Sequence, residues 1–195
     1  GPYDFKFEQN RMTVKGGGKL ADMPIDFTWN KDFLNDGEGT SIDVSLTLDT
    51  DGLKKFGAPE TLHMDGTLPA TVHYKTTGKS SAFLSFKGDI TSASFAINAI
   101  NYQKPVAVKG TLDFDLQLEN NKPQKMSNLL MKTPDATLAG DVSFLNGALQ
   151  SARLGQFILG ETNISLNVDK DSRLGYNVKI SGQQADVSSF LESAP

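Results

Sequence analysis

The residues of this chain that most readily do chemistry near neutral pH are its two histidines, His63 and His73. Both lie on the polar side of an alternating segment, which suggests a pair of metal ligands. Ten residues of extended strand span roughly 33 Å, however, so in a straight strand the two rings cannot reach one ion. We therefore expect solvent-facing histidines and no metal site.

A second candidate site is the glycine run Gly16-Gly17-Gly18, which is followed by Lys19 and could cradle a phosphate. A P-loop needs a wider glycine spacing that ends in Gly-Lys-Ser/Thr, whereas Leu20 follows the lysine here. Glycine also permits positive φ without side-chain strain. The run therefore predicts a hairpin turn.

The remaining reactive side chains form no catalytic group in the sequence. There is no cysteine, which excludes disulfides, thiolate catalysis and cysteine-based metal sites. The histidines and the scattered carboxylates place no base, nucleophile and orienting group near one another. We predict that the protein is not an enzyme and that it needs no cofactor or metal ion.

The composition is that of a globular protein. Of the 195 residues, 38% are hydrophobic and 22% are charged. The net charge of -4 disfavours nucleic acid as a partner, because phosphate binding depends on clustered Lys and Arg. No apolar run approaches the roughly 20 residues of a transmembrane helix. Gly1-Pro2 looks like the scar left by removal of a tag, and we expect residues 3–195 to form a single domain.

The elements that must position these side chains are amphipathic β-strands. From Val106 to Glu119, apolar residues alternate with polar ones, as in a strand with one apolar and one solvated face. The same period recurs along the chain, and Asn146-Gly147 is the strongest hairpin signal between two such segments. By contrast, residues from Thr50 to Phe56 and from Asp186 to Leu191 have the caps or breakers of very short helices.

Three segments interrupt or blur the alternation. Pro69 has no N–H to donate, so it predicts an edge or a bulge in a bending strand. Residues 101–105 predict a turn before the strand that starts at Val106. The segment from Met126 to Lys132 fits a strand and a short helix equally.

The apolar positions of these strands form the candidate binding surface, because they are the side chains that should face one common layer. They are Phe5, Phe7, Ile25, Phe27, Trp29, Ile42, Val44, Leu46, Leu48, Leu62, Met64, Val72, Tyr74, Leu84, Phe86, Phe95, Ile97, Val106, Val108, Leu112, Phe114, Leu116, Leu118, Leu138, Val142, Phe144, Ile164, Leu166, Val168, Tyr176, Val178 and Ile180.

A recurring pattern runs through the second half of the chain. Its motifs are Leu149-Gln-Ser-Ala-Arg-Leu154, Leu159-Gly160-Glu-Thr-Asn-Ile164, Tyr176-Asn-Val-Lys-Ile-Ser-Gly182 and Ala185-Asp186-Val187-Ser-Ser-Phe-Leu191, with Met64-Asp-Gly-Thr-Leu-Pro69, Asn101-Tyr-Gln-Lys-Pro105 and Gly110 upstream. In their order and spacing they resemble the central region of the YhdP/TamB branch of the AsmA-like superfamily, over roughly residues 60 to 191. Tyr102 stands where that pattern would have tryptophan, and residues 1–59 match only in general character.

The resemblance implies an all-β fold in which a long curved antiparallel sheet forms an open, taco-like groove, with one or two very short helices. It also implies a periplasmic location, in a parent protein anchored in the inner membrane of a Gram-negative-type envelope by a segment outside this chain. This chain would be a fragment of a much longer repeating protein. Its partner would be a phospholipid or another acyl lipid moving toward the outer membrane, and outer-membrane or periplasmic proteins are further candidates.

Three hypotheses for the apolar rows stay open. Alternation alone favours a closed, dry β-sandwich, whose two halves use these residues as an ordinary core. The resemblance favours a trough that takes up acyl chains, at about 0.8 kcal/mol for each buried methylene. A scaffold that assists the assembly of outer-membrane proteins, by strand addition at exposed sheet edges, is the third.

Overall fold

The computed structural model describes residues 2–34, 39–56, 63–97, 102–171 and 175–184, which form two sheets and one short helix. The large sheet contains β1 (Asp4–Glu8), β2 (Arg11–Leu20), β3 (Met23–Asp32), β4 (Thr40–Leu48), β6 (Leu68–Thr76), β7 (Ser81–Asp89), β10 (Thr111–Glu119), β11 (Lys122–Lys132), β12 (Ala136–Leu145), β13 (Ala148–Leu159), β14 (Thr162–Asp171) and β15 (Gly175–Gln184). The small sheet contains β5 (His63–Gly66), β8 (Ala93–Ile97) and β9 (Tyr102–Lys104), and the helix is α1 (Thr50–Lys55).

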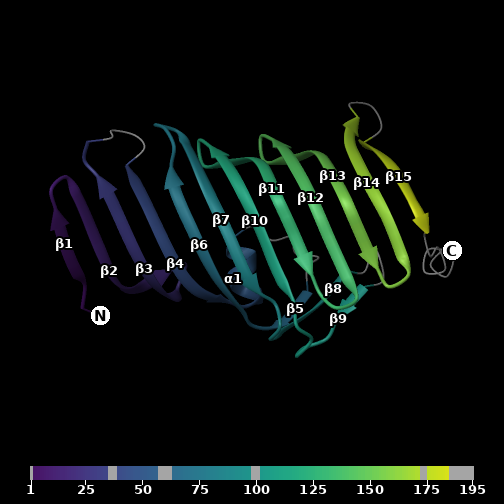
Figure 1. The fold of residues 1–195 in the computed structure, drawn as a ribbon, viewed down its shortest axis with the longest axis horizontal. Helices are drawn as coiled ribbons and strands as arrows, with labels where there is room; N and C mark the ends of the chain where they lie inside the picture. Colours follow the sequence, from purple (N-terminus) through teal and green to yellow (C-terminus); the bar gives the residue numbers. More distant parts are fainter. Residues whose placement is uncertain (1, 35–38, 57–62, 98–101, 172–174, 185–195) are drawn as a thin grey trace.

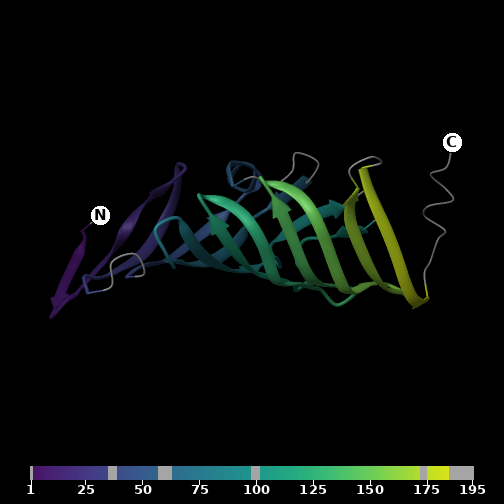
Figure 2. The same cartoon turned by 90° about the horizontal axis from the view of Figure 1, so that it is seen from above.

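The twelve strands of the large sheet follow one another in space in their chain order, and each pairs antiparallel with the next (Figure 1). The sheet is open, with β1 at one edge and β15 at the other. Figure 2 shows that the strands are bowed and that the sheet twists along its length. The predicted fold class, a long curved antiparallel sheet with a very short helix, is confirmed.

The chain leaves the large sheet twice, and the two excursions form a second layer. Between β4 and β6 it forms α1 and β5, and between β7 and β10 it forms β8 and β9, which pair with β5. We call α1, β5, β8 and β9 the covering layer. It lies at one end of the strands, at the bottom of Figure 1, and we call the opposite ends the open rim. This layer is far smaller than the large sheet, so no sandwich of equal halves forms.

The register of the large sheet places the apolar residues on one face. Residues directly opposed in an antiparallel pair point to the same side. Phe27 of β3 is opposite Val44 of β4, which is opposite Val72 of β6. The row continues through Phe86 of β7 to Phe114 of β10, and these two rings stack with centroids 4.8 Å apart. The alternation read from the sequence is thus one continuous apolar face.

The helix and several turns follow the local sequence signals. The predicted helix is α1, and the Asp49 carboxylate accepts a hydrogen bond from the Gly52 N–H at 2.7 Å, as an N-cap does. Asn146 (φ 54) and Gly147 (φ 83) make the predicted hairpin between β12 and β13. The segment from Met126 to Lys132 is strand, within β11.

The prediction of a turn at Gly16–Gly18 is wrong. These residues lie inside β2, and the turn to β3 is at Ala21 and Asp22, whose φ angles are 50 and 70. The Tyr3 ring occupies the space that a Cβ on Gly16 would need. The glycine is therefore required for close approach of an aromatic ring and not for chain reversal.

The strand predicted from Val106 begins only at Thr111, so its first five residues are a correction. Residues 106 and 107 form a turn, in which Ala107 has a φ of 67. The Ala107 N–H donates to the Thr91 carbonyl at 2.9 Å. Val106 is 60% exposed and Val108 lies between the turn and the strand. Non-local pairing with Thr91, which alternation does not encode, decides this segment.

Two other sequence predictions need correction at their elements. Residues 102–104, predicted as a turn, form the short strand β9. Pro69 lies in β6, an interior strand, but it precedes Ala70, the first residue of β6 that pairs with β7. A proline is tolerated there because it stands at the start of the strand. Leu62 and the helical turn predicted at residues 186–191 lie outside the described residues.

Candidate functional site

The candidate site is the apolar face of the large sheet, because most of the predicted lining residues meet there. The structure places on it Phe5, Phe7, Ile25, Phe27, Trp29, Ile42, Val44, Leu46, Leu48, Val72, Tyr74, Leu84, Phe86, Leu112, Phe114, Leu116, Leu118, Leu138, Val142, Phe144, Ile164, Leu166, Val168, Tyr176, Val178 and Ile180.

The other predicted residues lie elsewhere. Met64 and Phe95 are opposite each other in the small sheet, where β8 also contains Ile97. Both Met64 and Phe95 pack on the apolar face from the covering layer. Val106 and Val108 belong to the loop before β10 and take no part in the face.

Sequence reasoning missed lining residues beside β-bulges. Leu154 and Phe157 of β13 both face the apolar side, opposite Leu166 and Ile164 of β14, although they are three positions apart. The pairing skips residues between them, so strict alternation fails there. Gly155, a glycine inside a strand pattern, is the signal that would have indicated the bulge.

Burial of the apolar face falls from the covering layer toward the open rim. On β4, Leu48 is 3% exposed and Val44 is 8% exposed, whereas Ile42 is only half-buried. The buried end packs against the covering layer, which contributes Tyr102 to the same core, and against Ile90 from the segment between β7 and β8. The strand β4 therefore has a covered end and an uncovered end.

The edges of the sheet are the most open part of this face. Phe5 of β1 is 67% exposed, and Val178 and Ile180 of β15 are 57% and 58% exposed. The whole chain exposes 12429 Å², whereas folded monomers of its 21.1 kDa expose about 9,000 Å². A sheet whose apolar face is only partly covered exposes more surface than a closed core of the same mass.

Buried polar groups hold the strands of the covering layer together and attach that layer to the large sheet. The Lys104 ammonium is fully buried and donates to the carbonyls of Ala93 at 2.8 Å and Pro105 at 3.1 Å. Burial lowers the pKa of Lys104, although the nearby carboxylates of Asp89 and Asp135 partly oppose that effect.

Tyr102 makes the polar attachment to the large sheet, whereas the two bonds of Lys104 stay within the covering layer. Its hydroxyl lies 3.1 Å from Thr133 Oγ1, in the turn between β11 and β12, and desolvation raises the pKa of the phenol. The Thr133 hydroxyl in turn donates to the Asp135 carboxylate at 2.7 Å. The covering layer is thus an integral part of the fold.

The opposite, polar face brings together three residue types that could act in nucleophilic catalysis. Asp43, His73 and Ser85 are directly opposed on β4, β6 and β7, and Nδ1 of His73 is hydrogen-bonded to Oδ1 of Asp43 at 2.7 Å. They line a hollow with Thr71 and Lys87. Sequence reasoning missed this row because the three residues come from separate strands. The row sits inside a paired sheet, whose backbone N–H groups are used in strand pairing and offer no oxyanion site.

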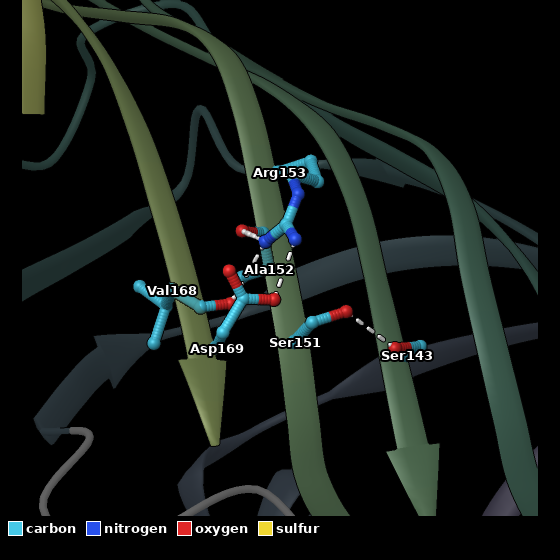
Figure 3. Close-up of polar contacts among 6 residues, drawn as sticks. All are labelled: Ser143, Ser151, Ala152, Arg153, Val168 and Asp169. Atoms are coloured by element: carbon cyan, nitrogen blue, oxygen red, sulfur yellow. Dashed lines mark hydrogen bonds and ion pairs between the residues drawn. The ribbon is translucent and has the colours of Figure 1, made fainter. Parts of the chain in front are cut away.

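Polar contacts also tie the strands together on that face near the C-terminal edge (Figure 3). The Arg153 guanidinium of β13 lies 2.5 Å from the Asp169 carboxylate of β14 and donates to the Val168 carbonyl at 3.0 Å. Ser143 and Ser151 join β12 to β13 with a hydroxyl contact of 2.6 Å. These side chains satisfy one another, which is a structural role.

Among the residues that the structure describes, no group of three or more His, Cys, Asp or Glu side chains is arranged to hold a metal ion. His63 lies in β5 and His73 in β6, so the two histidines belong to different sheets. No helix in the described ranges is long and apolar enough to cross a membrane.

The partly exposed apolar face is thus the feature of the described residues that best fits a binding surface. The chain matches no protein-family model, no curated protein and no solved structure.

Proposed function

We propose that this chain is a lipid-conducting segment of a periplasmic bridge between the inner and outer membranes, whose apolar face shields the acyl chains of phospholipids. One observation carries the proposal, namely the apolar face that runs unbroken across twelve strands and stays half-exposed at the open rim. The resemblance to the AsmA-like superfamily is the basis for the proposed periplasmic location and for the choice of lipid as the ligand.

The physical basis is burial of acyl methylenes on side chains that otherwise face water. Each methylene taken from water contributes about 0.8 kcal/mol. Half-buried residues such as Ile42, Leu84 and Leu116 supply the contact surface. Such a surface binds an acyl chain without a polar group that recognises it. It therefore suits the passage of lipids along the sheet.

The experiment is site-specific photo-crosslinking in cells. A photoreactive phenylalanine derivative replaces Leu116, which faces the apolar side of β10, or the neighbouring Gln117, which is exposed on the polar side. The proposal predicts phospholipid adducts at position 116 and none at position 117, detected by mass spectrometry of the purified protein. Equal labelling at both positions, or no lipid at position 116, would contradict it.

A second candidate function is a scaffold for outer-membrane proteins, which the edge strand β15 favours. Its residues 175–182 are exposed, and its outer edge has no neighbouring strand in the large sheet. An extended peptide could add there by backbone hydrogen bonds. A peptide that co-purifies with the chain, in place of lipid, would favour this function.

A further inference from the structure

The charges of the large sheet are distributed unequally between its two faces. In the described strands, every Asp and Glu of the large sheet lies on the polar face, as the register shows for Asp26, Asp43 and Asp113. The apolar face has two charged side chains in these strands, and both are lysines, Lys31 and Lys170. The chain as a whole has more acidic than basic residues, 23 against 19. The charged positions of the apolar face are therefore positive in a chain that is negative overall.

Both lysines lie at the open rim. Lys31 is next to the last residue of β3 and is opposite Met12 and Thr40, and Lys170 is next to the last residue of β14 and is opposite Tyr176. Neither is paired with a carboxylate within the described part of the chain. A lysine in this position lays its apolar stem on the face and keeps its ammonium group in water.

Lys31 and Lys170 are too far apart to contact one lipid headgroup. Eight inter-strand steps lead from β3 to β14 in the sheet, which is about 38 Å at roughly 4.8 Å for each step. Lys31 and Ile25 are six positions apart on β3, which is about 20 Å of extended strand. Ile25 packs against the buried core. An acyl chain laid along the strand therefore has its polar end beside the lysine.

We propose that the lipid on this face is a phospholipid with an anionic headgroup, whose phosphate is held at the open rim by Lys31 at one end of the sheet and by Lys170 at the other. This inference rests on the proposed function. The lysine ammonium is a strong partner for phosphate, and a carboxylate on the same face would repel it. Near β3 the core formed with the covering layer occupies the opposite end of the strand, at Met23 and Ile25, so the headgroup faces the open rim. Lys170 has the same rim position on β14.

The test compares the binding of two lipids whose headgroups differ in net charge. The purified chain is mixed with equal amounts of phosphatidylglycerol and phosphatidylcholine that have identical acyl chains, and bound lipid is counted by native mass spectrometry. The test variant is the double charge reversal K31E/K170E. The matched control is K75E/K125E, which reverses two exposed lysines on the polar face of β6 and β11.

We expect the unmodified chain to prefer phosphatidylglycerol, and K31E/K170E to lose about tenfold in phosphatidylglycerol binding with phosphatidylcholine binding unchanged. The control should keep the preference. Added salt should weaken the preference, because the ammonium groups are solvated.

The possible failures are distinguishable. Equal binding of the two lipids by the unmodified chain, an unchanged preference in K31E/K170E, or equal loss of both lipids in that variant overturns the headgroup assignment and leaves the acyl trough standing. Binding of neither lipid by the unmodified chain contradicts the proposed function itself.

Discussion

Replacing Lys104 tests how much one buried ammonium contributes to holding the strands of the covering layer together. The side chain is fully buried, and its two hydrogen bonds go to the carbonyls of Ala93 and Pro105. In Lys104→Ala both carbonyls lose their donor and a cavity remains, so we expect a loss of about 3–5 kcal/mol in the free energy of unfolding. Lys104→Met keeps most of the volume, and we expect it to lose roughly 1–2 kcal/mol, because it also removes the desolvated charge.

The assay is urea unfolding followed by tryptophan fluorescence, since Trp29 lies on the apolar face. With a slope of about 2 kcal/mol per molar urea, the Lys104→Ala loss moves the midpoint down by roughly 2 M. A Lys104→Ala midpoint within about 0.25 M of the unmodified chain, or about 0.5 kcal/mol on this slope, would refute the reasoning. The covering layer would then be held together without the bonds of this ammonium.

The same lysine gives a pH dependence with a defined sign. Burial lowers its pKa in the folded state, so between that value and the ordinary 10.5 the unfolded chain binds a proton that the folded chain does not. Stability therefore rises with pH through this window, and Lys104→Met should abolish the rise. The pKa of Tyr102 is raised by desolvation, so its contribution has the opposite sign. Above pH 10 the unfolded phenol loses its proton first, and stability falls.

Two of the three further predictions use matched pairs of variants. Leu116→Asp should reduce the phospholipid that co-purifies with the chain, whereas Gln117→Asp on the opposite face should not, as lipid extraction and chromatography would measure. Val178→Lys should suppress concentration-dependent association in sedimentation experiments, because a charge on an apolar edge strand opposes edge pairing, and unchanged association would argue against β15 as the sticky edge. Gly147→Ala should cost about 1 kcal/mol in urea unfolding, since φ is 83 there with no steric contact. Gly155→Ala, equally free of contacts and without positive φ, should stay within about 0.5 kcal/mol.

The sequence predicts which residues share a face because that information is local. A period of two assigns Phe114 and Leu116 to one side of a strand without reference to any partner. Local turn chemistry likewise predicts the hairpin at Asn146-Gly147. The same logic fails at Gly16, where the ring of Tyr3, thirteen residues earlier (16 − 3), and not the backbone, decides that glycine is needed.

Features that depend on pairing between distant segments were beyond sequence reasoning. The covering layer forms because β5 pairs with β8, across the whole of β6 and β7. The sequence did not predict that the covering layer buries Lys104, because residues 101–105 have the pattern of a polar turn. The row of Asp43, His73 and Ser85 also appears only when β4, β6 and β7 are aligned. Lys31 and Lys170 can be assigned to one face only when the register of every strand between β3 and β14 is known.

The covering layer also explains how an open sheet stays folded with half of an apolar face uncovered. If the whole face were needed for stability, an uncovered half would drive pairing with another sheet or chain. Here the well-buried side chains, such as Leu48, Leu68 and Ile90, cluster where α1 and the small sheet lie. Side chains farther toward the open rim, such as Ile42, contribute less to that core. If the chain binds lipid as proposed, stability and lipid contact depend on opposite ends of the same strands, and a polar substitution near the open rim should weaken lipid binding while the fold persists.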